Sequence, residues 1–531
     1  RNDAGHQQPD LIRMTLPTPL TKGQEKKVLM TTAIVSGMGF ADMMAVNTAL
    51  PVMQAQLGMD AASALWVAEI YLLFVASLMM MGGALGDRFG YRRVLRYGII
   101  AFAASSLFCA ASTSGDMLIF ARATQGLAAA IVLPSSLALL NACFPAAQRG
   151  MAIGSWTAIS SMMIPLGPLA GGAAVDLLSW HWIFIINLPL CAAAFLFLRG
   201  VPKPPFGQTA TAHLDIIGII GITSGLGALV FGLLEGARRG FGDDLVLVSL
   251  IAAAVLLPLL IIYEAICKHP MLPLWMFRRR VFVLVNVQTF LFFAGFQGSL
   301  FLLPFFHIQV YGLTALQAGA AGLPISIAIV LLSRPVGKLM DKHGAGPLLA
   351  SAPFLVAGGL FWLAQAPADG NFFRHVLPAL AVLATGLGFF IAPLTTVALN
   401  AAGEGRSGLA SAVNNSMARI AGLVSVAMMG VLLTNGFTKN LATSLDALGL
   451  DPEQMKLITD QVHRLGALVP PASLSQNQAA ALDISVRTAF TAGFSDAVLV
   501  ASVSTVLAGF VGIIGLKAFS RPASQSEDRN T

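Results

Sequence analysis

The chain has 531 residues, of which 56% are hydrophobic and only 11% are charged. Soluble domains carry roughly 25% charged residues, so a chain of this composition cannot cover a water-facing surface of ordinary size. No soluble basic segment carries the net charge of +7, so the composition argues against a nucleic-acid-binding protein and indicates a membrane protein.

Apolar runs of about 20 residues recur from end to end, and each is long enough to cross a bilayer as a helix. Helices satisfy their own backbone groups in lipid, so the sequence predicts an all-α polytopic membrane protein. The first run is too long for a cleaved signal and predicts a retained span. The fourteen predicted spans lie near 28–52, 64–85, 95–113, 117–141, 150–175, 181–199, 215–236, 245–266, 281–306, 318–337, 347–365, 375–399, 407–434 and 489–516.

The distribution of basic residues predicts the orientation. Most of the 32 lysine and arginine residues lie in the two tails and in alternate connecting segments, whereas the short connections on the other side hold only Arg238, Arg239 and Arg374. Basic segments stay in the cytoplasm. We therefore expect a multi-pass protein of the cell (inner) membrane with both termini in the cytoplasm.

Ionisable side chains within the spans are the first functional candidates. Asp42 lies in span one, Glu69 in span two, Arg122 in span four and Asp496 in the opening turns of span fourteen. Intramembrane charges are costly and mark substrate, ion or proton pathways. A carboxylate in a low-dielectric setting resists ionisation, so one site can hold either a proton or a cation. At span edges we expect interfacial or capping side chains, namely Asp176, Glu235, Glu264 and His307.

A short segment occurs twice along the chain. Gly83-Ala-Leu-Gly-Asp87-Arg-Phe-Gly90 follows span two, and Gly337-Lys-Leu-Met-Asp341-Lys-His-Gly344 follows span ten. An offset of eight spans predicts two six-span halves separated by two extra spans, with the substrate path between the halves. The expected division is a tail at 1–27, a bundle at 28–199, the extra spans and connectors at 200–280, a second bundle at 281–518 with an external loop at 435–488, and a tail at 519–531.

Six motifs resemble one transporter family. The loop GGALGDRFGYRR, with Gly83, Asp87, Arg88, Gly90 and Arg92, resembles the signature loop between spans two and three of the major facilitator superfamily. Span four, FARATQGLAAAIVLP, is similar to that family's Arg-Gln-Gly pattern. Span five, IPLGPLAGG, resembles its antiporter motif through Gly167, Pro168, Gly171 and Gly172, although Met163 stands where the family usually has glycine. FADMMAVNTALP, WHWIFIINLP and GLASAVNNSMARIAG, in spans one, six and thirteen, resemble its fourteen-span drug:proton antiporters.

This resemblance implies the major facilitator fold and proton-coupled export of small hydrophobic, often cationic, compounds. It implies that Asp42, Glu69, Arg122 and Asp496 serve proton coupling or substrate binding, with an Asp42–Arg122 pair. Asp87 and its neighbours, with Asp341 as a degenerate second copy, would act as a latch, meaning a contact that holds helix ends together in one conformation only. Export of one specific metabolite or lipid, and uptake by proton symport, remain as alternatives.

A membrane-embedded enzyme is disfavoured, since the chain has no nucleophile elbow, paired metal ligands or nucleotide-binding loop. The four cysteines lie far apart, without metal spacing, and we expect no metal and no cofactor. The partners implied are substrate, protons and the bilayer, and no accessory envelope protein is identified. Within 435–488, Asp451 as N-cap and Pro452 predict a short amphipathic helix whose face includes Met455, Ile458, Val462 and Leu465.

Overall fold

The computed structural model describes residues 20–202, 215–267, 270, 274–401 and 407–519, and side chains within helices are described for most of these. Throughout these ranges the regular secondary structure is helical. The α-helices are α1 (Lys22–Gln56), α2 (Ala61–Phe89), α3 (Tyr91–Ala110), α4 (Gly115–Cys143), α5 (Ala146–Leu177), α6 (His181–Ile185), α7 (Asn187–Arg199), α8 (Ile216–Arg239), α9 (Asp244–Ile266), α10 (Arg280–Gln309), α11 (Ala315–Ala321), α12 (Leu323–His343), α13 (Gly346–Ala364), α14 (Phe372–Asn400), α15 (Ser407–Leu445), α16 (Pro452–Thr459), α17 (Gln476–Ile514) and α18 (Leu516–Phe519).

The helices confirm the polytopic membrane fold. Among the described residues, 13 helical stretches are long and apolar enough to cross a bilayer. Helix α5 has 32 residues and occupies the remaining predicted position, so the fourteen-span arrangement fits the structure. Two predicted spans consist of two consecutive helices, α6 with α7 and α11 with α12.

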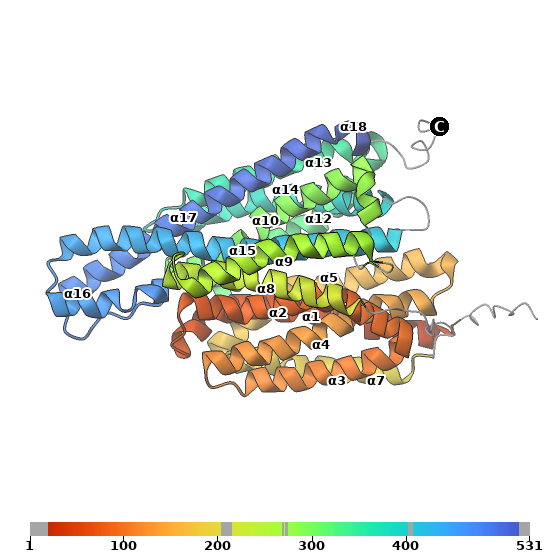
Figure 1. The fold of residues 1–531 in the computed structure, drawn as a ribbon, viewed down its shortest axis with the longest axis horizontal. Helices are drawn as coiled ribbons and strands as arrows, with labels where there is room; N and C mark the ends of the chain where they lie inside the picture. The colour runs from red at the N-terminus through yellow and green to blue at the C-terminus, as the bar shows by residue number, and fades with distance from the viewer. Residues whose placement is uncertain (1–19, 203–214, 268–269, 271–273, 402–406, 520–531) are drawn as a thin grey trace, which may run out of the picture.

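The spans form two groups that lie side by side. In Figure 1, α1–α7 run from red to yellow along one side and α10–α17 run from green to blue along the other. The extra helices α8 and α9 lie over the seam, where α8 contacts α2 and α15 and α9 packs on α8. We call α1–α7 the first group and α10–α17 the second group. The end of the molecule that carries α16 is called the outer end, following the predicted orientation.

The segment 435–488, which the sequence predicts to be an external loop, is helical at both of its ends. Helices α15 and α17 have 39 residues each, about 58 Å of helix, and so extend well past a hydrocarbon core of about 30 Å. Their outer turns include the start and end of the predicted loop, and Figure 1 shows them projecting with α16 at their tip.

The predicted short helix is confirmed at its start only. Asp451 caps α16, and its carboxylate accepts a hydrogen bond of 2.7 Å from the amide of Gln454. The helix ends at Thr459, and the chain continues as the separate 3-10 helix η3 (Val462–Ala467). Ile458 and Leu465 of the predicted apolar face are buried, and η3 packs on α1, α2, α15 and α17.

The repeated motif is a helix break rather than a loop. Helix α2 continues to Phe89 and α3 begins at Tyr91, so Gly90, at φ 88°, makes the whole turn. In the second copy Gly344, at φ 75°, ends α12. Only glycine adopts such positive φ angles without strain, which explains why both copies end on glycine.

Close contacts join the two groups at the outer end. A Cβ atom placed on Gly172 of α5 would lie 2.4 Å from the carbonyl oxygen of Ala315, and one on Gly319 of α11 would lie 2.3 Å from that of Pro168. Asp176 is exposed at the edge of α5, as expected, and its carboxylate accepts hydrogen bonds of 3.1 and 2.8 Å from the amides of Ala315 and Leu316. The outer end is therefore closed where α5 meets α11.

His307 is not the interfacial side chain that the sequence predicts. It is 2% exposed, and its ring lies 5.4 Å from that of Phe372, because the start of α14 covers this end of α10. Among the cysteines, Cys109, Cys143 and Cys191 are buried, and Cys267 is partly buried.

Candidate functional site

Asp42 and Arg122 form a buried ion pair within the first group. The Oδ2 atom of Asp42, on α1, lies 2.7 Å from the Nη1 atom of Arg122, on α4, and their side chains are at most 1% exposed. The predicted contact between these two residues is therefore present. A buried pair of this kind is stable only when further hydrogen bonds satisfy its remaining atoms.

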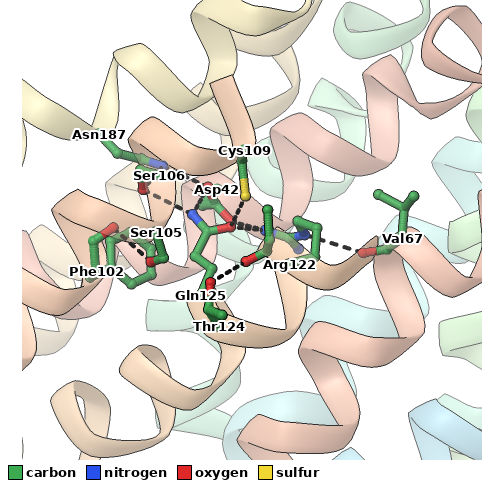
Figure 2. A network of polar contacts seen from close by, with 11 residues as sticks. Asp42, Val67, Phe102, Ser105, Ser106, Cys109, Arg122, Thr124, Gln125 and Asn187 are labelled. Carbon is green, nitrogen blue, oxygen red and sulfur yellow. Dashed lines mark hydrogen bonds and ion pairs between the residues drawn. The ribbon is translucent and has the colours of Figure 1, made fainter. Parts of the chain in front are cut away.

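Three neutral residues complete the network around Asp42 (Figure 2). Its Oδ1 atom accepts hydrogen bonds from Gln125 at 3.0 Å and from Asn187 at 2.6 Å. Both amides also donate to the hydroxyl of Ser106, at 3.0 and 3.4 Å. The sequence prediction did not include Gln125, Asn187 or Ser106 in the site. Gln125 lies one turn after Arg122, so both side chains are on the same face of α4. This spacing is the feature of the sequence that could have placed Gln125 in the site.

The guanidinium of Arg122 is held on its other sides by α2. Its Nε atom donates to the carbonyl of Val67 at 3.2 Å, and its centre lies 4.2 Å from the ring centroid of Tyr71. The Nη1 atom also donates to Gln125 Oε1 at 2.5 Å. The network thus ties together α1, α2, α3, α4 and α7.

This network fits the charged form of Asp42. Arg122 has only donors, and Gln125 and Asn187 direct their NH2 groups at the carboxylate. A proton on Oδ2 would face the guanidinium, and a proton on Oδ1 would face two amide donors. Turning the Gln125 amide to accept that proton would direct its NH2 group at Arg122. Protonation of Asp42 therefore requires the helices or side chains around it to rearrange.

Glu69 lies apart from this network. Val67 and Tyr71, which contact Arg122, are two positions before and after Glu69, so its side chain leaves α2 on the opposite face. One turn away on its own face, Leu65 meets Gly430 of α15, and one turn the other way Leu73 meets Gly227 of α8. Glu69 is fully buried, and neither carboxylate oxygen has a hydrogen-bond partner among the described residues.

The structure does not bring Asp496 into either site. Asp496 is exposed on α17, and its Oδ2 atom would lie 3.1 Å from a Cβ atom on Gly436 of α15, at the outer part of the second group. Asp42 and Glu69 thus occupy buried positions on two sides of α2, whereas Asp496 lies in the second group.

The latch residues show how the motif packs at the inner end. Arg92 donates a hydrogen bond of 3.0 Å to the carbonyl of Arg199 at the end of α7, within the first group. Arg88 is exposed, and a Cβ atom on Gly83 would meet nothing within 4 Å. The side chains of Asp87 and Asp341 lie outside the described part of the structure. The latch therefore stays a prediction.

The span-five motif is a packing surface of α5. Cβ atoms on Gly167 and Gly171 would lie 2.7 and 2.8 Å from the carbonyl oxygens of Ala41 and Ala45, so these glycines let α5 approach α1, next to Asp42. Met163 of α5 stands where the family usually has glycine. It faces Gly37 of α1, and a Cβ atom on Gly37 would lie 2.6 Å from Met163 Cγ, so here α1 supplies the glycine of the contact. Helices that pack tightly against each other in a membrane need small residues at the contact.

Comparisons with known proteins identify the family. The sequence model described as Major Facilitator Superfamily matches residues 32–426. The Methylenomycin A resistance protein of Bacillus subtilis is 32% identical over 76% of this chain and 87% of its own length. The Multidrug resistance protein Stp of Mycobacterium tuberculosis is 31% identical over 91% of both chains. The Tetracenomycin C resistance and export protein of Streptomyces glaucescens is 28% identical over 97% of this chain and 95% of its own length.

A solved structure shows the same fold. A bacterial homologue of the human lysosomal transporter Spinster, in an inward-facing and unoccupied conformation, covers 95% of this chain and 100% of its own with a TM-score of 0.65, at 15% sequence identity. The motifs, the helical fold and the family match agree along the chain. The protein belongs to the Major Facilitator Superfamily, as a multi-pass membrane transporter.

Proposed function

We propose that the protein exports small hydrophobic, often cationic, compounds in exchange for protons. The observation that carries this proposal is the Asp42 network, because protonation of Asp42 requires the helices or side chains that donate to its carboxylate to rearrange. The contacts that would change join α1, α2, α4 and α7, so proton binding at this site can alter helix packing, which is what exchange between two faces of a membrane requires.

Glu69 supplies a second acid for the same cycle. Its carboxylate is buried on the face of α2 whose Leu65 and Leu73 meet α15 and α8, apart from the Asp42 network. An intramembrane acid without a partner marks a proton or cation pathway. We propose that Glu69 exchanges a proton for the cationic group of a substrate.

The names of the relatives support export of toxic compounds. One relative is named for multidrug resistance and another for tetracenomycin C resistance and export. Several relatives are named for a single antibiotic, which favours a second candidate function, export of one specific compound. Both candidates use the same exchange of substrate for protons.

Inverted membrane vesicles give the direct test. Vesicles that contain the protein should accumulate compounds from a panel of hydrophobic cations when an imposed pH gradient drives protons outward, and an ionophore that dissipates the gradient should stop this. Accumulation of many unrelated compounds indicates multidrug export, and accumulation of one indicates the specific exporter. Accumulation that is independent of the gradient would contradict proton coupling.

We further propose that both termini are cytoplasmic and that the two groups are the two six-span bundles of the fold. On a background without the four native cysteines, a cysteine at exposed Ser473 should react with a membrane-impermeant maleimide added to sealed cells, and a cysteine at Arg92 should not. Reaction at position 92 would reverse the orientation.

A further inference from the structure

Leu465 has a backbone conformation that leucine rarely adopts. Its φ is 54° and its ψ is −130°, and it is the one residue other than glycine with positive φ in the described ranges. Although it belongs to the segment beyond the membrane spans, its side chain is 4% exposed. A bulky residue held in this region is strained and persists only where its surroundings fix it.

The Leu465 side chain lies between the two groups of helices. It shares a small cavity with Ala61 and Leu65 of α2, in the first group, and with Leu302 of α10 and Leu433 of α15, in the second. The space left among them is about 10 Å³, which is at most enough for one water molecule. Leu465 therefore packs between α2 and α10 at the outer end, next to a larger cavity of about 360 Å³ that lies between α2 and α15.

The neighbours of Leu465 fix this position from both sides. The carbonyl of Arg464 accepts a hydrogen bond of 3.2 Å from Gln54 on α1, in the first group. Gly466 approaches Gln309 on α10 so closely that a Cβ atom on Gly466 would lie 2.9 Å from the Cβ atom of Gln309. The 3-10 helix η3 is thus seated on both groups, one residue on each side of Leu465.

We propose that Leu465 is the outer plug of the transport path, a side chain that must leave α2 before the outer end can open. The chain connects η3 to α15 and α17, so η3 belongs to the second group by covalent linkage. When the outer ends separate, the contacts with Gln54, Ala61 and Leu65 are the ones that break. This proposal rests on the proposed exporter function, because a plug has a role only if the two groups separate.

Solvent access at the outer end provides a test that needs no substrate. The reporter is a cysteine at Leu302, which is 1% exposed and lines the plug cavity, on a background without the native cysteines. Leu465→Ala should raise the rate at which the cysteine at position 302 reacts with an impermeant maleimide in sealed cells by about tenfold or more. A large-to-small change at a packed site destabilises that packing, here the closed outer end. Leu465→Met should restore slow reaction. The matched control is Leu457→Ala in α16, since Leu457 is 44% exposed.

Equal reaction rates in Leu465→Ala and Leu457→Ala would overturn the plug. Leu465→Gly distinguishes the effect of the side chain from that of backbone strain. It removes the side chain and also relieves the strain, since glycine tolerates the positive φ. Leu465→Gly should react as fast as Leu465→Ala, and slow reaction in it would mean that backbone strain, not the side chain, controls access. Because labelling is independent of any transported compound, its outcome stands even if the exporter assay fails.

Cross-linking tests whether the plug must move relative to the first group. A short thiol cross-linker between cysteines at Gln54 and Arg464 joins η3 to the first group and should abolish transport until the linker is cleaved. The same reagent between cysteines at Ala442 of α15 and Val462 of η3, which line one cavity, joins η3 to the second group, to which the chain already ties it, and should leave transport unchanged. Loss of transport in both pairs, or in neither, would contradict the proposal.

Discussion

The Asp42 carboxylate lies 2.7 Å from the Arg122 guanidinium, and both side chains are buried among membrane-spanning helices. Both side chains are shielded from bulk solvent, so each charge depends on the other and on Gln125 and Asn187. Any event that changes the charge of Asp42 therefore acts on Arg122, and through it on α2, where Arg122 contacts Val67 and Tyr71.

Asp42→Asn should abolish proton-driven export while the protein still inserts in the membrane. Loss of one partner of a buried pair costs about 3–5 kcal/mol, because the other charge stays buried and uncompensated. Vesicle transport with an imposed pH gradient and the thermal unfolding temperature measure the two effects. The double variant Asp42→Asn/Arg122→Gln should regain stability but not transport. Transport at the wild-type rate by Asp42→Asn, at matched expression, would remove Asp42 from the mechanism.

Asn187→Ala should weaken the Asp42 site without removing a charge. It deletes the 2.6 Å hydrogen bond to the carboxylate, and a hydrogen bond to a charged group contributes about 1.5–3 kcal/mol. We expect a lower unfolding temperature and slower export. Ser105→Ala is the control, because Ser105 donates only to Phe102 of its own helix, next to Ser106 of the network. Equal effects of the two variants would argue that the network has no specific role.

Glu69→Gln should impair export of cationic compounds more than export of neutral ones. The change keeps the shape of a buried side chain and removes the acid that could exchange a proton for a cation. The control Glu235→Gln alters an acid of α8 that is paired with Arg239 at 2.7 Å, and it should leave the ratio of cationic to neutral export unchanged. A panel of matched charged and neutral compounds in vesicles measures this ratio. Equal losses for both classes would exclude a role of Glu69 in substrate charge selection.

Gly172→Ala should slow export of every compound. The added methyl group would lie 2.4 Å from the carbonyl oxygen of Ala315 and so would prevent α5 and α11 from closing the outer end. We expect a loss of about tenfold, equivalent to about 1.4 kcal/mol of bias against the closed state. Gly358→Ala on α13 is the control, because a Cβ atom there would meet nothing within 4 Å, and it should be close to wild type. Uniform tolerance of alanine at Gly172 would show that this contact does not limit transport.

Asp87→Asn should slow export of all compounds to a similar degree and leave equilibrium binding of substrate intact. Asp87 lies near the inner end of α2, away from the Asp42 network, so its effect should fall on the change between conformations. Asp341→Asn, in the degenerate second copy, should have a smaller effect. Rates across a compound panel, together with binding to detergent-solubilised protein, separate the two properties. A changed order of preferred compounds would contradict the latch.

The sequence alone determined the membrane class, the positions of most spans and the buried acids worth testing. Each of these depends on local properties. A run of about 20 apolar residues forms a helix in lipid because the helix satisfies its own backbone, and an ionisable residue within such a run is conspicuous. The duplicated glycine-rich motif also predicted two equivalent helix ends, which Gly90 and Gly344 form.

Tertiary structure decided which of these residues meet. Asp42 is 80 residues from Arg122 and 145 from Asn187, and their contact depends on how α1, α4 and α7 pack. Neutral amides such as Gln125 and Asn187 look like ordinary packing residues until a charge lies beside them. The sequence likewise could not predict the separation of Glu69 from Asp42 or the burial of Leu465. Hydropathy reports the preference of each residue for lipid, and it does not report which partner covers that residue.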